Sequence, residues 1–170
     1  MVKQILKIYA TKLELYHLLL RSISKFQKNS YLCNVIILLY FTMIQQVTNG
    51  IKISVKTNFE GKSHQNDRTY FSFSYSITIE NQSNDSVQLI SRHWKIFDSL
   101  KNLEIVEGEG VIGEKPTIAP KKSYTYSSYC NLSSPIGSMK GFFNMINFTT
   151  TKNFRVHIPS FQLIVPAISN

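Results

Sequence analysis

The chain has 170 residues, of which 43% are hydrophobic and 12% aromatic, and its formal net charge is +9. This composition is typical of a folded globular protein and excludes an intrinsically disordered one. The Lys and Arg residues stand apart rather than in a run or stripe, which argues against a nucleic-acid-binding surface.

The first 42 residues differ in composition from the rest, with six basic side chains against one acidic side chain. Apolar residues at spacings of three and four predict a basic amphipathic helix over residues 3–27. The apolar run at residues 31–41 is shorter than the roughly 20 residues needed to span a bilayer, and no signal-peptide cleavage site follows it. We therefore expect no stable membrane insertion, while contact with a membrane surface stays open.

Two alternatives remain for residues 1–42. They form a helical or unstructured extension of the protein, or they are upstream sequence translated in frame with a true start at Met43. The second alternative rests on the abrupt change of composition at that position. In both cases the domain itself is expected over residues 43–170.

Alternation of apolar and polar residues with a period of two begins in the second part of the chain and indicates β-strands. Residues 51–56 form the first strand, residues 61–67 are expected to be a polar loop, and residues 70–79 place five apolar side chains on one strand face. The turn-rich residues 81–85 then lead to a strand at residues 87–98, which predicts a hairpin.

The remaining segments continue this pattern. Residues 104–107 form a short strand, and Pro116 and Pro120 bracket an edge piece, because proline cannot donate to a central ladder. Further strands are expected at residues 124–129, 139–148, 154–158 and 161–165. About seven to nine strands, each with one apolar face, predict two sheets packed face to face. The expected fold class is therefore all-β, an immunoglobulin or fibronectin type III-like β-sandwich.

A glycine-rich run, GEGVIG, fits the template G-x-G-x-x-G with Gly108, Gly110 and Gly113. In dinucleotide-binding folds a helix follows this template and holds the pyrophosphate at its N-terminus. Here a Lys-Pro pair follows at once, so no helix starts there and the dinucleotide interpretation fails. Two alternatives stay open: a loop whose amides bind a nucleotide or pyrophosphate anion, and glycines that adopt positive φ at a corner of the sandwich.

Acidic side chains surround this run and repel phosphate; they are Glu107, Glu109 and Glu114. Carboxylate oxygens suit Mg²⁺, so a divalent-metal site at this cluster is a further alternative. The four histidines lie far apart and lack the spacing of a dedicated metal site. No nucleophile has a histidine near it in sequence, so we expect no catalytic residues and no cofactor.

Arg92 and His93, with the three glycines, are the candidate residues for binding an anionic ligand or a partner. Alternation from Leu89 places Ser91 and His93 on one face of the strand, and Arg92 and Trp94 on the other. Trp94 is expected to anchor the core. Arg92 on the same side must reach a carboxylate or solvent at the strand edge, because an unpaired buried guanidinium is prohibitively costly.

Five blocks of the sequence together resemble the bacterial ApaG proteins. In order they are LISRHW at 89–94, GEGVIGEKP at 108–116, AP at 119–120, PIGSMKG at 135–141 and IPSFQL at 158–163. The resemblance covers about residues 47–165. The chain departs from the family's pattern at Tyr129 and Asn131, on either side of Cys130, which puts a role for this cysteine in doubt. Bacterial members begin where Met43 stands here, which favours Met43 as the start.

The resemblance implies a fibronectin-type β-sandwich and a cytoplasmic protein associated with cobalt and magnesium resistance or efflux. It also implies a protein-binding role, because the same domain occurs in F-box substrate adaptors and in a polymerase-delta-interacting protein of eukaryotes. No established reaction comes with the family. An ion pump needs membrane-spanning helices, so any effect on these ions must be indirect.

We therefore expect a non-enzymatic module that binds an unidentified protein partner through the sandwich face or edge near the glycine run. The alternative is a nucleotide- or pyrophosphate-binding protein, such as a hydrolase accessory, that uses the glycine-rich loop with Arg92.

Overall fold

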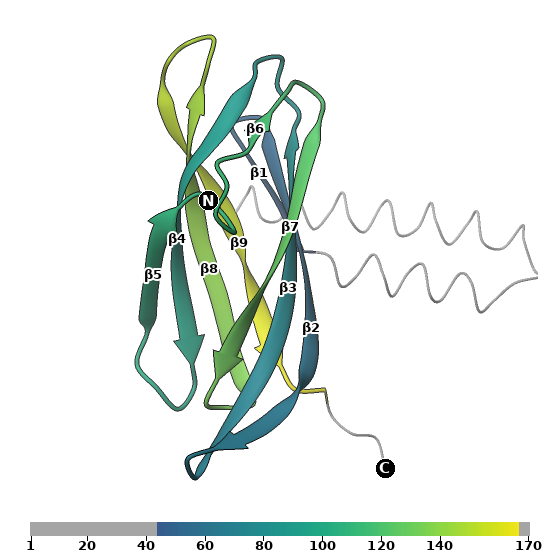
Figure 1. Ribbon diagram of the computed structural model, residues 1–170. Helices are drawn as coiled ribbons and strands as arrows, with labels where there is room; N and C mark the ends of the chain where they lie inside the picture. Colours follow the sequence, from purple (N-terminus) through teal and green to yellow (C-terminus); the bar gives the residue numbers. More distant parts are fainter. Residues whose placement is uncertain (1–43, 167–170) are drawn as a thin grey trace, which may run out of the picture. The chain divides into compact units, whose positions relative to one another are not determined.

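The computed structural model describes residues 44–166, which form two antiparallel β-sheets packed face to face (Figure 1). The predicted all-β sandwich is confirmed. The expectations for residues 1–42 and for a start at Met43 lie outside the described residues. Within the described part of the chain, no helix has the length and apolar character needed to cross a bilayer.

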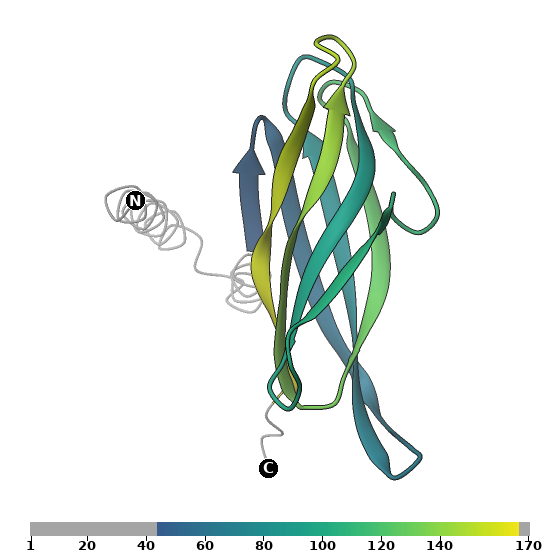
Figure 2. The ribbon, with the colours of Figure 1, turned by 90° about the vertical axis from the view of Figure 1, so that its left-hand side faces the viewer.

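Four strands form the first sheet, in the order β1-β2-β3-β7. Their bounds are β1 Ile44–Thr48, β2 Ile51–Gln65, β3 Arg68–Asn81 and β7 Ser123–Leu132. The second sheet has five strands, in the order β5-β4-β8-β9, with β6 also paired to β4. Their bounds are β4 Val87–Asp98, β5 Glu104–Glu109, β6 Thr117–Ile118, β8 Ile136–Asn147 and β9 Asn153–Ile164. β1 runs beside β9 where the two sheets meet (Figure 2), and the His157 N–H donates to Thr48 Oγ1 there.

The core lies between the sheets and takes alternate side chains from each. Phe73 on β3 is fully buried, as the apolar face of that strand predicts. Trp94 on β4 is only 2% exposed and meets the ring edges of Tyr75 from the first sheet and Phe143 from its own. The tryptophan therefore joins the two sheets, as expected for a core anchor.

The loop predicted at residues 61–67 is wrong, because β2 continues to Gln65 past a bulge at Glu60 and pairs with the start of β3. The chain reverses only at Asn66 and Asp67, which both have positive φ. The side chains of residues 62–65 are exposed, so ladder hydrogen bonds rather than burial hold this polar segment in a strand.

The hairpin predicted between residues 70–79 and 87–98 is also wrong. A turn does join the two strands, but β3 pairs with β2 and β7, while β4 pairs with β5, β6 and β8. The turn therefore crosses from one sheet to the other. The buried side chain of Asn81 fixes this crossing, since its Nδ2 donates to the carbonyl oxygens of Asp85 at 2.8 Å and Ile118 at 3.0 Å.

Bulges account for two further differences from the predicted strands. The segments predicted at residues 154–158 and 161–165 are one strand, β9, because Pro159 lies in a bulge opposite Lys140 and needs no ladder hydrogen bond there. In β4 an extra residue at Ile90 shifts the register. Leu89 is therefore buried in the core on the side of Trp94, not on the face of His93 as simple alternation predicts.

Candidate functional site

The glycine-rich run is a turn that closes on itself. The backbone N–H groups of Val111 and Glu114 donate to each other's carbonyl oxygens at 2.8 and 2.9 Å, across Ile112 and Gly113, which both have positive φ. Gly110 also has a positive φ of 55°, and a Cβ placed on it would lie 2.0 Å from the Glu114 carbonyl oxygen. Glycine is required at this position by backbone conformation and by space.

Backbone N–H groups of this run already donate hydrogen bonds within the fold. The Gly110 N–H donates to the Ile90 carbonyl at 2.8 Å, and those of Val111 and Glu114 close the turn. These three N–H groups are therefore not available to the phosphate of a ligand. The arrangement supports the structural alternative for Gly110 and Gly113, whereas Gly108 lies within β5.

The three glutamates around the run have three separate partners. Glu107 Oε1 lies 2.5 Å from His93 Nδ1, Glu109 pairs with Lys115 at 2.8 Å, and Glu114 accepts from the Tyr124 hydroxyl. The hydrogen bond and charge of Lys115 lower the pKa of the Glu109 carboxyl. Within residues 44–166, no group of three or more His, Cys, Asp or Glu side chains is arranged to hold a metal ion.

Arg92 binds the backbone of the glycine-rich run. Its Nη1 donates to the carbonyl oxygens of Glu109 at 3.0 Å and Gly110 at 2.8 Å. A Cβ on Gly108, the cross-strand neighbour of Arg92, would lie 3.0 Å from the guanidinium, so the absence of a side chain there lets the guanidinium lie close to β5. Of the two predicted partners for Arg92, the carboxylate is wrong, because backbone carbonyls of the edge strand and the glycine-rich turn accept from Nη1 instead. The side chain is half-buried, so solvent contact at this edge stays a prediction.

His93 lies on the opposite side of β4, on the surface of the second sheet that points away from the core. We call this surface, formed by the outward side chains of β4, β5, β8 and β9, the outer face. The imidazole stacks on Phe142 at 4.6 Å between ring centroids, and the Arg155 guanidinium lies 4.5 Å from the centre of the same phenyl ring. His93 Nε2 is buried and has no hydrogen-bond partner among the described residues. Arg92 and His93 therefore lie on opposite sides of β4.

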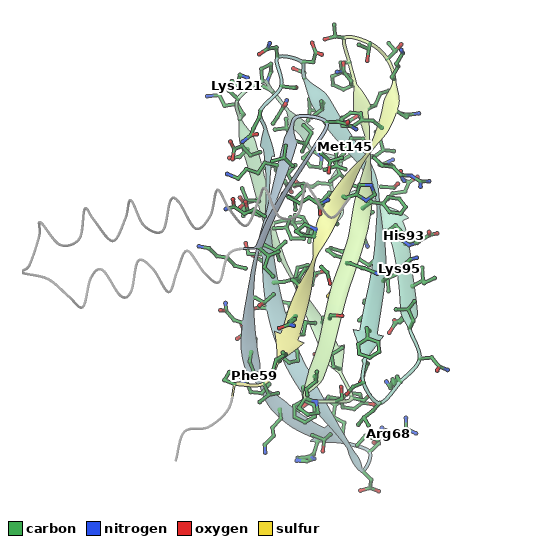
Figure 3. The ribbon with its side chains drawn as sticks, turned by 180° about the vertical axis from the view of Figure 1, so that it is seen from behind. Phe59, Arg68, His93, Lys95, Lys121 and Met145 are labelled. Carbon is green, nitrogen blue, oxygen red and sulfur yellow. The ribbon has the colours of Figure 1, made fainter. Side chains whose placement is uncertain are left out.

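An open pocket of about 350 Å³ lies on the outer face beside His93. Figure 3 labels two of its lining residues, His93 and Lys95, which lie near each other. Side chains from four strands line it: Gln46, His93, Lys95, Lys140, Phe142, His157 and Ser160. Lys95 and Lys140 are direct cross-strand partners on β4 and β8. Sequence reasoning found only His93 of this set, because every other member except Lys95 is 47 to 67 residues away in the chain and meets it only through strand pairing.

An apolar row crosses one end of the same face. Lys95 and Ile105 are cross-strand partners, Phe97 follows Lys95 outward on β4, and Ile136 pairs with Ile164. With two leucines of the loop after β4 they form the set we call the apolar end. Its members are each 45–73% exposed: Phe97, Leu100, Leu103, Ile105, Ile136 and Ile164.

Asp98 holds the backbone beneath the apolar end. Its carboxylate accepts from the Leu100 N–H at 3.1 Å and from the Ser133 N–H at 2.6 Å, and so ties the loop after β4 to the loop before β8. Burial of Asp98 favours the neutral acid, but hydrogen bonds from Ser134, Leu100 and Ser133 outweigh it and lower the pKa.

Cys130 is a buried free thiol on β7. Burial, with smaller contributions from nearby Glu104 and Asp98, raises its pKa to about 11. A thiol in this state is a poor nucleophile at neutral pH. Its neighbour Tyr129, one of the departures from the family's pattern, points outward and is 72% exposed.

Comparisons with known proteins agree with the sequence blocks. A family model described as the ApaG domain matches residues 61–147. A protein named ApaG from Acidithiobacillus ferrooxidans is 37% identical over 126 residues, which are 74% of this chain and 98% of that protein. Protein ApaG of Shewanella woodyi is 40% identical over 124 residues, 72% of this chain and 97% of its own. A crystal structure of a Bordetella pertussis protein titled ApaA matches with a TM-score of 0.63 and 32% identity, covering 68% of this chain and 94% of that one.

Proposed function

The chain belongs to the ApaG domain family, and from that premise we propose that it is a non-enzymatic module that binds another protein through the apolar end of the outer face. The observation that carries the proposal is the exposure of six large apolar side chains on neighbouring strands and one loop. A folded protein rarely leaves so many apolar side chains together in water unless something covers them.

The shape of the apolar end suits a protein partner. Phe97 is on β4, the strand that lies between β5 with Ile105 and β8 with Ile136. A central aromatic surrounded by aliphatic side chains is a common arrangement of an interface hot spot. The buried, hydrogen-bonded Asp98 keeps the two supporting loops in place without a partner.

The charges next to the apolar end select the kind of partner. Lys95 adjoins the row on β4, Lys140 lies across from it, and Lys101 is in the loop that carries Leu100 and Leu103. A partner segment with apolar side chains flanked by Asp or Glu fits this surface. We assign the partner this acidic, amphipathic character.

No reaction is part of the proposal. The thiol of Cys130 is buried in its protonated form, and the Nδ1 atom of His93 contacts Glu107 rather than a nucleophile. The association of the family with cobalt and magnesium tolerance is then indirect: the domain acts in the cytoplasm on a protein partner and does not itself move or hold the ion.

Site-specific photo-crosslinking in the native host tests this proposal. A photoreactive phenylalanine analogue replaces Phe97 in the full chain, and the same analogue replaces Tyr129 as the matched control. Both positions are exposed aromatics, but Tyr129 lies on the other sheet. We expect a discrete crosslinked protein from position 97 only. Equal crosslinking from both positions, or from position 129 alone, contradicts the assignment.

The captured protein is then purified and its affinity measured by calorimetry. Phe97→Asp and Ile136→Asp are expected to weaken binding about tenfold or more, because each places a charge in the centre of an apolar contact. Tyr129→Asp should leave the affinity unchanged. Unaltered binding by both outer-face variants overturns the proposed surface.

A further inference from the structure

The pocket beside His93 has an unusual set of lining groups. Lys95, Lys140, His157, Ser160 and Gln46 can all donate hydrogen bonds, and no carboxylate is among the described residues that line the pocket. The nearest acidic side chain identified on this face, Glu107, contacts His93 Nδ1. The glycine-rich run differs in charge, because three glutamates surround it.

The positions of the two lysines lower the stability of the folded domain. Lys95 and Lys140 stand directly opposite each other on adjacent strands, and like charges in that position destabilise a sheet. No ion pair to either lysine occurs among the described residues. A local cost that nothing in the domain offsets is typical of a functional position.

The bulge in β9 shapes the same pocket. Gly141 pairs with Ile158 and Met139 with Phe161, so Pro159 and Ser160 both lie opposite Lys140. Because Ile158 and Pro159 are buried in succession, the exposed side chains on either side of them are those of His157 and Ser160. Bulges recur beside binding sites because they re-aim side chains in this way. The bulge thus adds two donors around the pair of ammonium groups.

His93 contributes an unsatisfied atom. Its ring is held on one side by stacking on Phe142 and at Nδ1 by Glu107, while Nε2 is buried without a partner. A buried polar atom left unpaired is costly in the free domain. The ring is therefore pre-positioned, with one polar atom that the domain itself does not satisfy.

We propose that this pocket is a binding site for the phosphoryl group of a small molecule, a phosphate monoester or pyrophosphate. The two ammonium groups match the double negative charge, and Ser160 and His157 supply further polar contacts. A volume of about 350 Å³ is at the small end of ligand pockets, which suits a compact phosphorylated molecule. The site is separate from the glycine-rich run. It shares Lys95 and Lys140 with the charged border of the apolar end, but it does not include the apolar side chains that carry the protein-binding proposal.

Titration of the ¹⁵N-labelled full chain with sodium pyrophosphate, orthophosphate and glycerol phosphate tests the site, with sodium chloride at equal ionic strength as reference. We expect saturable amide shifts around Lys95, Gly141 and Ser160. The double variant Lys95→Gln/Lys140→Gln should bind about tenfold more weakly or worse. The double variant Lys56→Gln/Lys122→Gln, which removes two exposed lysines outside the second sheet, is the matched control and should bind normally.

The three anions separate the sources of the phosphoryl group. Preference for pyrophosphate assigns a diphosphate ligand, and preference for glycerol phosphate assigns a monoester. Shifts no larger than those from sodium chloride, shifts centred on residues 110–114, or equal binding by both double variants overturn the proposal. Phe97→Ala, which removes the apolar side chain without adding a charge beside Lys95, should titrate like the unaltered chain, so this test is distinguishable from that of the protein-binding surface.

Discussion

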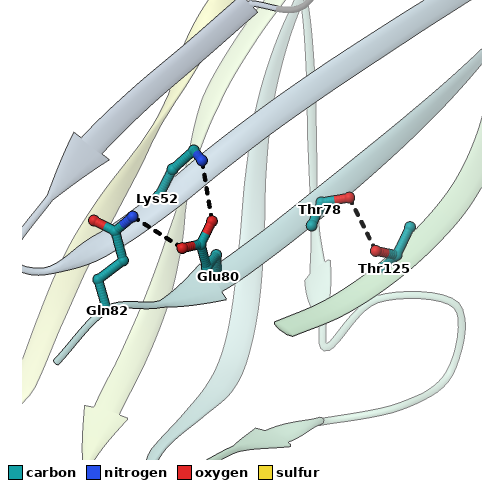
Figure 4. Close-up of polar contacts among 5 residues, drawn as sticks. All are labelled: Lys52, Thr78, Glu80, Gln82 and Thr125. Carbon is teal, nitrogen blue, oxygen red and sulfur yellow. Dashed lines mark hydrogen bonds and ion pairs between the residues drawn. The ribbon is translucent and has the colours of Figure 1, made fainter. Parts of the chain in front are cut away.

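The two sheets contribute similarly to one core, but their outward surfaces differ. On the first sheet the polar side chains satisfy one another: Thr78 and Thr125 share a hydrogen bond of 2.9 Å across β3 and β7, and Glu80 accepts from Lys52 and Gln82 (Figure 4). On the second sheet two lysines face each other without a carboxylate, and a row of apolar side chains is exposed.

We therefore assign the outer surface of the first sheet to stability and that of the second sheet to binding. Both surfaces are pleated, antiparallel and built on the same alternation, so the backbone does not explain the contrast. The polar side chains named on the first surface are paired within the free domain, whereas the second surface has an unpaired lysine pair and a row of apolar side chains that another molecule can complement. Substitutions on the two surfaces should therefore have different consequences, which the following predictions measure.

The largest effect is expected where both sheets share a side chain. Trp94→Ala removes the indole that meets Tyr75 of one sheet and Phe143 of the other. The loss of this buried ring should lower the free energy of unfolding by about 3–5 kcal/mol. Urea unfolding followed by circular dichroism gives the value. A loss under about 1 kcal/mol would mean that the two sheets do not share one core. Changes in the free energy of unfolding on their two outer surfaces could then not be compared directly.

The next effect concerns the glycine-rich turn, which belongs to neither surface. Gly110→Ala forces an L-residue into positive φ and also into the Glu114 carbonyl, whereas Gly113→Ala meets only the conformational penalty, because space is open there. The conformational penalty is about 1–3 kcal/mol at each position, so Gly110→Ala should exceed Gly113→Ala clearly in urea unfolding. Equal losses at the two positions would show that the turn relaxes away from the close contact.

A smaller, pH-dependent effect is expected at Asp98, beneath the apolar end. Its pKa is lowered in the folded state, so its contribution to stability is complete above the ordinary value of 3.8 and is lost as the pH falls through the lower folded value. Asp98→Asn should therefore cost about 1–2 kcal/mol at pH 7 and less at pH 2–3.

Unfolding curves across this pH range, compared with Asp67→Asn in the exposed β2–β3 turn, isolate the Asp98 contribution. A loss from Asp98→Asn that is the same at both ends of the range would mean that its charge has no part in holding the loops.

Local periodicity predicted the strands well, and failed where pairing is distant. The apolar face at residues 70–79 is read directly from alternation, and Phe73 and Ile77 are buried as that pattern requires. The partner strands are not encoded by the turn that follows Asn81, so the predicted hairpin became a crossing between sheets. Extra residues in a strand, such as Ile90, carry no side-chain signal, which is why Leu89 was assigned to the wrong face.

Local sequence patterns predict even less of the candidate site, because its residues come together only through the pairing of distant strands. Arg92 and the glycines attract attention as a motif, yet they satisfy one another within the fold. Lys95 and Lys140 form no motif, because they are 45 residues apart and only the β4–β8 register brings them together. Pro159 marks a bulge only once β8 is known to lie opposite it.

The smallest effects should have opposite signs on the two surfaces, and they test the comparison most directly. Lys140→Glu replaces a like-charge pair with an opposite-charge pair across from Lys95, so it should raise the free energy of unfolding by up to about 1 kcal/mol. Lys52→Gln removes an ion pair of 3.1 Å with Glu80 and should lower that free energy by less than about 1 kcal/mol, since solvent screens the pair.

Both variants are measured by urea unfolding at low and at high salt, because screening reduces each change. The Lys140→Glu domain should be more stable but should lose binding of pyrophosphate, since the repulsion that it relieves is the same charge that attracts the ligand. Stabilisation together with retained anion binding would separate the lysine pair from the pocket. Destabilisation at both positions would mean that the two surfaces are alike, and that the lysines of the second sheet have partners in the folded domain.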